Sequence, residues 1–420
     1  MLNKLENAAY IKPLVEEVEK QIAPIHEAID RRIEENQFRV LQSFQKYKVS
    51  DVHFNPSTGY GYDDLGRDTL DEIFADCFGA EAGLVRTQII SGTHAISTAL
   101  FGVLRPGDEL LYITGKPYDT LEEIVGIRGE AIGSLKEYSI GYSSVPLLSN
   151  GKVDFDAVRL AMNEKTKMIG IQRSRGYATR PSFVIEEIKE MIDFVKGINP
   201  NVVVFVDNCY GEFVETQEPT HVGADLMAGS LIKNPGGGLA KTGGYIVGRA
   251  DLVERCAYRL TCPGIGREAG ASLYTLQEMY QGFFLSPHVV GQSLKGAVFT
   301  AALLEKLGMN STPKWDAKRT DLIQAVQFDD RDKMIAFIQA IQFASPINSY
   351  VTPQPAYMPG YEDDVIMAAG AFIQGASIEL SADGPLRPPY VAFIQGGLTY
   401  SHVKIAICMA IDSLISKKLV

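Results

Sequence analysis

The sequence predicts an α/β protein with a mostly parallel sheet in a large domain and a smaller α+β domain at the C-terminal end. Short apolar runs rich in β-branched residues alternate with amphipathic segments from about residue 50 onward, as in βαβ units. One run, VVVFVD, ends at Asp207, as a central strand does when its carboxyl end reaches a ligand cleft. Beyond about residue 286, longer helical stretches replace the alternation.

Three domains are expected along the chain. Residues 1–49 form an N-terminal helical arm, because apolar residues recur at helical spacing until Pro24 breaks the run, after which the spacing resumes. The large domain spans 50–286 and the small domain 287–420, which ends with a helix near 399–416. The strands expected in the large domain lie within GLVRTQIISG, DELLYIT, MIGIQ and VVVFVD.

Composition narrows the class of protein. The chain has 420 residues, 46% of them hydrophobic, which is enough for a large core. Its net charge of −11 disfavours binding to nucleic acid or to an anionic membrane, so a small-molecule substrate fits better. No signal peptide and no long apolar run is found, and we expect a soluble, cytoplasmic protein. The five cysteines and six histidines show no metal-ligand or disulfide pattern.

Lys233, in the segment SLIKNPGGG, is a candidate for a reactive amine. It ends a short apolar segment and precedes a glycine-rich turn, which is a poor place for a solvated surface charge. A desolvated lysine becomes partly neutral and can form a Schiff base with a carbonyl cofactor. The alternatives are an ordinary loop lysine at this position and Lys241, in GGLAKTGG, as the amine that reacts.

Asp207, at the end of the VVVFVD strand, precedes Lys233 by enough chain for one more helix and strand. A carboxylate there can hold a pyridine nitrogen protonated, as enzymes that use pyridoxal 5′-phosphate (PLP) commonly require. The alternative is that Asp207 merely caps the following helix.

The segment ISGTHAIS predicts a phosphate site. Ser91, Gly92 and Thr93 follow a β-branched run and open a helix, whose first N–H groups favour an anion. Ser230 can add a hydroxyl to the same phosphate. This signal is weak when taken alone, because many strand-to-helix turns contain Ser and Gly without a ligand.

Tyr118, in GKPYDTLEEI, follows another predicted strand and can stack on a pyridine ring. His94 is a second aromatic candidate. Half-buried packing for Tyr118, and an ordinary helix-start role for His94, are the alternatives.

These motifs together resemble the fold-type-I PLP enzymes of cysteine and methionine metabolism. The resemblance is closest to the methionine γ-lyase family, in the branch called aluminium resistance protein, and it extends from about residue 50 to the end. It implies that Lys233 carries the cofactor, Asp207 faces the pyridinium nitrogen, Tyr118 stacks on the ring, and Ser91, Gly92, Thr93 and Ser230 hold the phosphate. The segments that carry it are SGTHAISTAL, PYDTL, VDNCYGEF, SLIKNPGGG, GYGYDDLGRD and RSRGYATRPSF.

The sequence also departs from the pattern of the wider family. Where that family reaches a neighbouring subunit's phosphate with Tyr-x-Arg, this chain has GYGYDDLGR, which makes Tyr60 and Arg67 the candidates. Arg173 and Arg175 are predicted either to bind a carboxylate or the cofactor, or to be surface cations. Arg387 is placed where an arginine would bind the substrate's α-carboxylate.

The resemblance implies a PLP-dependent carbon–sulfur lyase of amino-acid metabolism that acts on a sulfur-containing amino acid, as methionine γ-lyase or cystathionine β-lyase does. It also implies a homodimer or a homotetramer. The alternatives are a PLP-dependent aminotransferase, racemase or decarboxylase, and a stress protein that binds PLP or a metal without turnover.

Overall fold

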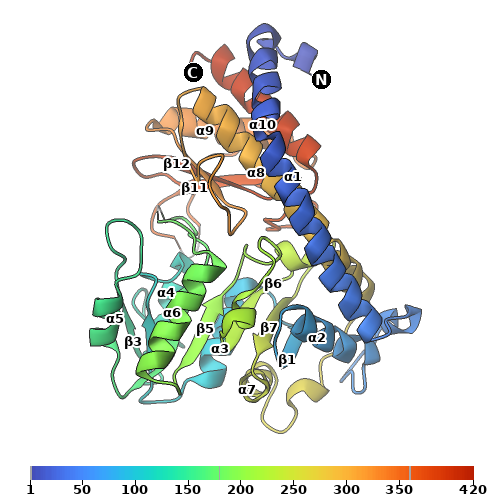
Figure 1. The fold of residues 1–420 in the computed structure, drawn as a ribbon, viewed down its shortest axis with the longest axis vertical. Helices are drawn as coiled ribbons and strands as arrows, with labels where there is room; N and C mark the ends of the chain where they lie inside the picture. The colour runs from blue at the N-terminus through green and yellow to red at the C-terminus, as the bar shows by residue number, and fades with distance from the viewer. Residues whose placement is uncertain (1, 179, 359–360) are drawn as a thin grey trace.

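The computed structural model describes residues 2–178, 180–358 and 361–420. In these residues a seven-stranded sheet forms the core of the larger part, drawn in the lower half of Figure 1. Its strand order is β1-β7-β6-β5-β4-β2-β3, and every neighbouring pair is parallel except those of β7. The mostly parallel sheet is therefore confirmed. The strands are β1 (Ala82–Arg86), β2 (Glu109–Tyr112), β3 (Gly141–Ser144), β4 (Thr166–Gln172), β5 (Val203–Asp207), β6 (Leu226–Ser230) and β7 (Gly244–Gly248).

Helices cover both faces of this sheet. Strand β5 shows why its sequence is a continuous apolar run: Val203 and Phe205 pack with α3 and α7, whereas Val204 and Val206 pack with α5 and α6. Successive strand residues point to opposite faces, so a strand buried on both faces carries no polar alternation. The helices are α1 (Ala8–Lys46), α2 (Leu65–Cys77), α3 (Gly92–Val103), α4 (Asp119–Val125), α5 (Phe155–Ala161), α6 (Ile185–Ile198), α7 (Ala250–Leu260), α8 (Leu276–Lys306), α9 (Arg331–Phe343) and α10 (Tyr400–Ser416).

Two long helices join the two halves of the molecule. Helix α1 lies along α8 and runs past both sheets (Figure 1). The expected break at Pro24 was wrong, because Pro24 lies inside α1. The boundary expected at residues 286 and 287 falls inside α8, and Pro287 is a helical residue. Each proline removes one backbone hydrogen bond, but the buried apolar stripe between α1 and α8 offsets that loss.

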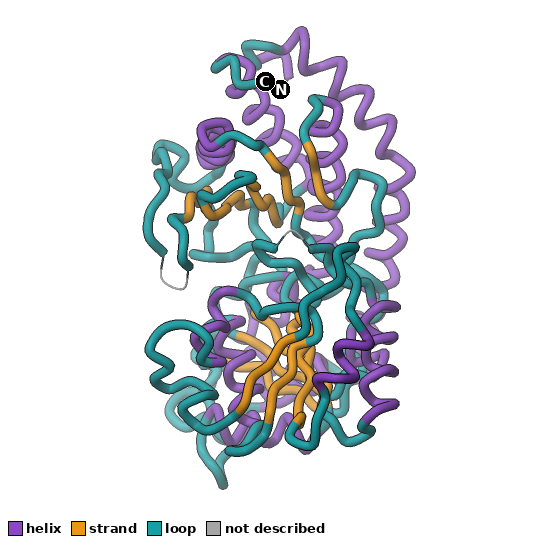
Figure 2. The backbone as a smooth tube through the Cα atoms, turned by 90° about the vertical axis from the view of Figure 1, so that its left-hand side faces the viewer, coloured by secondary structure: helices purple, strands orange, loops and turns teal. Residues whose placement is uncertain are grey.

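The smaller part is built on an antiparallel sheet with strand order β10-β11-β12-β9-β8. Helices α8, α9 and α10 pack against each other and against this sheet, which confirms a smaller α+β domain. The chain ends lie side by side (Figure 2). A hydrogen bond of 2.9 Å from Asn7 Nδ2 to Asp412 Oδ1 joins them. The strands are β8 (Asn310–Thr312), β9 (Gln324–Gln327), β10 (Val365–Ala368), β11 (Ser381–Pro385) and β12 (Val391–Gln395).

Across the described ranges, each helix is either too short or too polar to cross a lipid bilayer.

Candidate active site

Three adjacent parallel strands end at one edge of the large sheet. Gln172 at the end of β4 pairs with Asp207 at the end of β5, and Asp207 pairs with Ala228 near the end of β6. Open α/β sheets bind their ligands outside this edge. The polar side chains that follow these strands are therefore placed around one cleft.

A cleft at this edge brings together residues that the sequence singled out from four separate segments. Its lining includes Gly92, Thr93, Tyr118, Asp207 and Lys233. The placement agrees with the predicted constellation, while the role of each side chain stays a prediction.

Lys233 lies shortly after β6 and is half-buried, with Nζ 4.1 Å from the centre of the Tyr210 ring. Burial alone would lower the pKa of its ammonium, but the acidic groups around it, Cys209, Tyr210, Asp207 and Glu212, outweigh burial and raise that pKa. A cation bound beside Asp207 would offset this negative charge and lower the lysine pKa toward a reactive range.

Lys241, the rival amine, lies outside the cleft. Its side chain is 69% exposed and forms an ion pair with Glu278.

Asp207 is almost fully buried, and its Oδ1 accepts a hydrogen bond of 3.1 Å from the backbone N–H of Cys209. Burial raises the pKa of the carboxyl group, whereas the positive charge of Lys233 opposes that rise. Residues 209–217 form turns and bends, so the alternative that Asp207 caps a helix was wrong. Asp207 instead lines the cleft, and its role toward a pyridine nitrogen stays a prediction.

The start of α3 offers a site for an anion. Ser91 is the N-cap residue, and its Oγ accepts a 3.0 Å hydrogen bond from the backbone N–H of His94. Gly92 and Thr93 follow, and the N–H groups of a first helical turn have no partner within the helix. The His94 ring lies at the start of the same helix, where its Nδ1 accepts a 3.2 Å hydrogen bond from the Ile90 backbone N–H. This contact agrees with the alternative expected for His94, an ordinary histidine at a helix start.

Space beside this helix start is restricted. A Cβ added at Gly92 would lie 3.2 Å from Cys209 Sγ and 3.3 Å from Ser230 Cβ. Ser230 Oγ is buried and has no hydrogen-bond partner among the described residues. A buried hydroxyl without a partner costs free energy unless a ligand satisfies it, which supports an anion at this point.

Tyr118 precedes α4 and borders the same cleft. Its hydroxyl lies 2.6 Å from that of Tyr361. A Cβ at Gly176 would lie 2.7 Å from Tyr118 Cδ2, so the glycine makes room for the ring. The stacking role predicted for Tyr118 remains a prediction.

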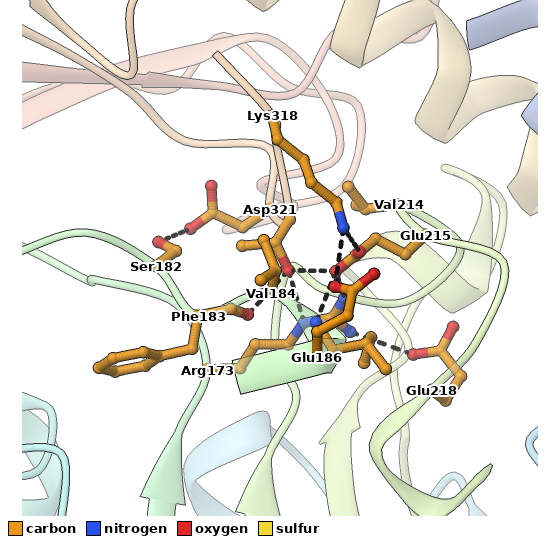
Figure 3. A network of polar contacts seen from close by, with 12 residues as sticks. Arg173, Ser182, Phe183, Val184, Glu186, Val214, Glu215, Glu218, Lys318 and Asp321 are labelled. Carbon is orange, nitrogen blue, oxygen red and sulfur yellow. Dashed lines mark hydrogen bonds and ion pairs between the residues drawn. The ribbon is translucent and has the colours of Figure 1, made fainter. Parts of the chain in front are cut away.

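Arg173 takes neither of the roles expected for it. Its guanidinium is fully buried and forms ion pairs with Glu215 and Glu218 at 3.1 and 3.3 Å (Figure 3). It also donates to Asn208 Oδ1 over 2.8 Å and to Thr320 Oγ1 over 3.0 Å. Because its donors are already used inside the protein, Arg173 is a structural cation that joins the loops after β5 to the segment before β9.

Arg175 and Arg387 border a second hollow that shares Tyr118 with the cleft. Arg175 is 2% exposed, so the surface alternative was wrong for it. It donates to the Thr312 carbonyl over 3.2 Å, and its Nε has no hydrogen-bond partner among the described residues. The side chain of Arg387 is 47% exposed and pairs with Asp363 at 3.0 Å.

Tyr60 and Arg67 do not border the cleft of their own chain. Tyr60 is 73% exposed and stacks on Tyr62, with ring centres 5.4 Å apart. Arg67 is buried and donates to the carbonyls of Gly61 and Gly270. Arg67 therefore fixes these two loops, whereas the ring of Tyr60 is mostly exposed.

Sequence reasoning missed the upper wall of the cleft, which includes Tyr177, Tyr361 and Asp383. Tyr210 could have been found, because it follows Asp207 in the same motif. Asp383 gave no signal, because it lies in a short strand of the smaller sheet. No cluster of three or more potential metal ligands is present among the described residues.

The methionine gamma-lyase family model matches residues 11–415. The chain belongs to this family. It is 75% identical to YnbB of Bacillus subtilis over the full length of both chains. A solved structure from Listeria monocytogenes, described as a candidate cystathionine beta-lyase involved in aluminium resistance, is 68% identical, with a TM-score of 0.95 over 96% of this chain and 100% of that one.

A more distant structure shows the fold alone. The PLP-dependent protein YhfS of Escherichia coli is 16% identical, with a TM-score of 0.62 over 92% of this chain and 97% of that one. Fold type I is thereby confirmed.

Membership of the methionine gamma-lyase family confirms PLP as the cofactor and carbon–sulfur lyase as the class of enzyme. The cleft suits this cofactor: Lys233 offers an amine, Asp207 a carboxylate, and the start of α3 with the unpartnered Ser230 hydroxyl a place for a phosphate.

Proposed function

We propose that this enzyme eliminates a thiol from the side chain of a sulfur-containing amino acid, with Lys233 as the residue that carries the cofactor and moves the proton. One observation carries the proposal: Lys233, Asp207 and the start of α3 line the same cleft. These are the amine, the carboxylate and the anion site that such chemistry requires.

Each part of the cofactor has a counterpart in the chain. Lys233 Nζ would hold the aldehyde carbon, Asp207 would face the ring nitrogen, and Tyr118 would lie against the ring. When bound, PLP supplies an electron sink for the negative charge that develops on the substrate's α-carbon. The phosphate would be held by Ser91, Gly92, Thr93 and Ser230.

Lys233 is then the base of the reaction. Once the substrate's amine takes its place, Lys233 Nζ accepts the proton from the α-carbon. For β-elimination, the bond between sulfur and the β-carbon then breaks; for γ-elimination, a second proton is first removed from the β-carbon, and the bond between sulfur and the γ-carbon breaks. In both cases the electron pair of the broken bond leaves with the sulfur, and a proton completes the thiol. The remaining fragment reacts with water to give a keto acid and ammonia.

Arg175 and Arg387 are the candidates for the substrate's α-carboxylate. Both border the hollow that Tyr118 shares with the cleft, and an arginine can hold a carboxylate through two parallel hydrogen bonds. Burial lowers the pKa of Arg175, and an anion beside it would reverse that effect.

We also propose a homodimer or homotetramer, which is supported by the exposure of Tyr60, since its ring is available to a neighbouring subunit's cofactor. A cytoplasmic location is supported by five cysteines that are all free.

A substrate screen tests the reaction. PLP-loaded protein is incubated with L-methionine, L-cysteine, L-cystathionine and S-alkyl cysteines, and thiol, keto acid and ammonia are measured. Equal amounts of the three products are expected from at least one substrate. Amino-group transfer, racemisation or decarboxylation without thiol release would contradict the proposal.

A further inference from the structure

Asp383 is a buried carboxyl group that faces the cleft from the smaller domain. It lies on β11, is 4% exposed, and lines a space of about 260 Å³ that Lys233 also lines. The cleft therefore meets an acid from one domain and the candidate amine from the other.

The hydrogen bonds of Asp383 are incomplete. Oδ2 accepts a bond of 3.2 Å from Gln395 Nε2, but Oδ1 has no hydrogen-bond partner among the described residues. Ser381 lies two positions earlier on the same strand face, and its buried Oγ also has no hydrogen-bond partner among the described residues. Burying such oxygens without a partner is costly, so a donor from a ligand would complete the site.

Asp383 also lacks a cation from the protein. Burial raises the pKa of its carboxyl group to about 7, and only a contact with the Tyr177 hydroxyl opposes that rise. In the described part of the chain, no lysine, arginine or histidine lowers the pKa of this carboxyl group. A buried carboxylate without a counterion either takes up a proton or binds a cation from solution.

Tyrosine rings surround this carboxyl group. Burial first, and the charge of Asp383 in smaller part, raise the pKa values of Tyr118, Tyr177, Tyr210 and Tyr361. The Tyr177 ring lies 5.6 Å from that of Tyr361 and 5.1 Å from that of Phe393. The faces of aromatic rings attract ammonium groups, most strongly where water is excluded.

Charge of the opposite sign gathers on the other side of Tyr118 and Tyr177. The hollow there is lined by four cations, Lys116, Arg175, Arg180 and Arg387, and by the acids Asp119 and Glu122, so positive charge predominates. The two tyrosines thus separate a cationic region, suited to the substrate's α-carboxylate, from the acidic region around Asp383.

We propose that Asp383 and the surrounding tyrosine rings bind an ammonium group at the far end of the substrate's side chain. The substrate class is then a thioether amino acid whose departing thiol carries an amino group. This proposal rests on the proposed function for the placement of the reacting amino acid, but the ammonium site itself can be tested without turnover.

A matched pair of substrates tests the preference. S-(2-aminoethyl)-L-cysteine and S-propyl-L-cysteine differ only by an ammonium group in place of a methyl group, and the corresponding homocysteine pair covers elimination from the γ-carbon. With wild-type PLP-loaded enzyme at about pH 8, kcat/KM for the ammonium member should be about tenfold higher or more. Equal values for both members would overturn the proposal.

Two variants assign the preference to one residue. Asp383→Asn keeps the shape of the side chain and should bring the two kcat/KM values together, while the melting temperature and the bound-cofactor absorbance stay near those of wild type. Asp332→Asn removes a charge from a side chain that is 80% exposed and should leave the preference unchanged. A preference that survives in Asp383→Asn would contradict the assignment.

A binding measurement separates this proposal from the proposed function. Calorimetric titration of the PLP-loaded protein with butylammonium and with butanol should show binding of the cation alone, and that binding should be lost in Asp383→Asn. Ammonium binding without thiol release from any amino acid would contradict the proposed function and support the ammonium site. Thiol release without ammonium binding, and without a preference for the ammonium substrate, would support the proposed function and contradict the ammonium site.

Discussion

The ammonium of Lys233 lies over the ring of Tyr210, with Nζ 4.1 Å from the ring centre. Tyr210 has a left-handed backbone, with φ of 73°, which is uncommon for a bulky residue. Such backbone positions concentrate where function requires a side chain to be held in place. The loop after β5 therefore positions both Asp207 and the ring against which the candidate amine rests.

Replacement of Lys233 should abolish attachment of the cofactor. Borohydride reduction of PLP-loaded protein, followed by peptide mapping, is expected to leave the pyridoxyl group on Lys233. Lys233→Ala should lose about 10²–10⁴-fold in kcat, because the base that accepts the α-proton is gone. Lys241→Ala, which removes an exposed lysine, is the matched control and should behave as wild type. A label on Lys241 would contradict the assignment.

Asp207→Asn should keep the cofactor but lose turnover. The amide oxygen can still accept the hydrogen bond from the Cys209 N–H, so the loop should fold as before. The lost negative charge no longer keeps the ring nitrogen protonated, and each unit of pKa lost there costs about 1.4 kcal/mol. We expect kcat to fall about tenfold or more, measured with saturating substrate. Near-normal kcat with unchanged stability would remove Asp207 from the mechanism.

Ser230→Ala should weaken the binding of PLP without destabilising the protein that lacks it. Ser230 Oγ has no hydrogen-bond partner among the described residues, so its removal leaves no group unpaired. A hydrogen bond to a charged phosphate contributes about 1.5–3 kcal/mol, so the Kd for PLP should rise about tenfold or more. Equilibrium titration of PLP and thermal melting of the cofactor-free protein measure the two effects. An unchanged Kd would place the phosphate elsewhere.

Arg173→Ala should destabilise the fold. The change removes the fully buried cation that pairs with Glu215 and Glu218 (Figure 3). The two glutamates then keep only weaker or more exposed partners, Lys318 at 3.1 Å and Arg39 at 3.7 Å. Breaking a buried ion pair costs about 3–5 kcal/mol in the free energy of unfolding. Lys318→Ala removes a half-exposed partner of Glu215 and should cost at most about 1 kcal/mol. Urea denaturation compares the two variants, and equal losses would contradict a structural role for Arg173.

The sequence could predict those features that depend on residues close to one another along the chain. The run in β5 is apolar throughout because both faces of the sheet are covered, and the position of Asp207 at its end follows from that strand. The glycine-rich turn after Lys233 likewise indicated, from local pattern, that this lysine is not a solvated surface charge, and Lys233 lines the cleft.

The remaining features depend on contacts between distant segments. Arg173 and Arg175 are two positions apart, but one meets buried glutamates whereas the other borders the hollow beside Tyr118. Pro24 remains helical because α8 packs against α1. Asp383 joins the cleft only because the smaller sheet packs above Lys233. None of these contacts leaves a periodicity or a motif in the sequence.

The preference for an ammonium substrate should grow as the pH rises through the pKa of Asp383, which is about 7. A carboxyl group is neutral below its pKa and charged above it, so the ionised fraction of Asp383 rises from about a tenth at pH 6 to about nine tenths at pH 8. An alkylammonium group stays protonated over this range, with a pKa near that of lysine, about 10.4. The other titratable groups that face Asp383 are Tyr118, Tyr177, Tyr210, Tyr361 and Lys233. The pKa values of the tyrosines are raised, so their hydroxyls should stay neutral over this range. Under the proposed function Lys233 carries the cofactor in the loaded enzyme and acts on both substrates alike.

Because kcat/KM reports the pKa values of the free enzyme, the ratio of kcat/KM for S-(2-aminoethyl)-L-cysteine to that for S-propyl-L-cysteine isolates Asp383. Groups that act on both substrates, such as Asp207 and Lys233, cancel in this ratio. The ratio should rise several-fold between about pH 6 and about pH 8 in the wild-type enzyme, because the carboxylate attracts only the ammonium member. In Asp383→Asn the ratio should stay flat. A ratio that rises equally in both proteins would mean that a different acidic group selects the substrate.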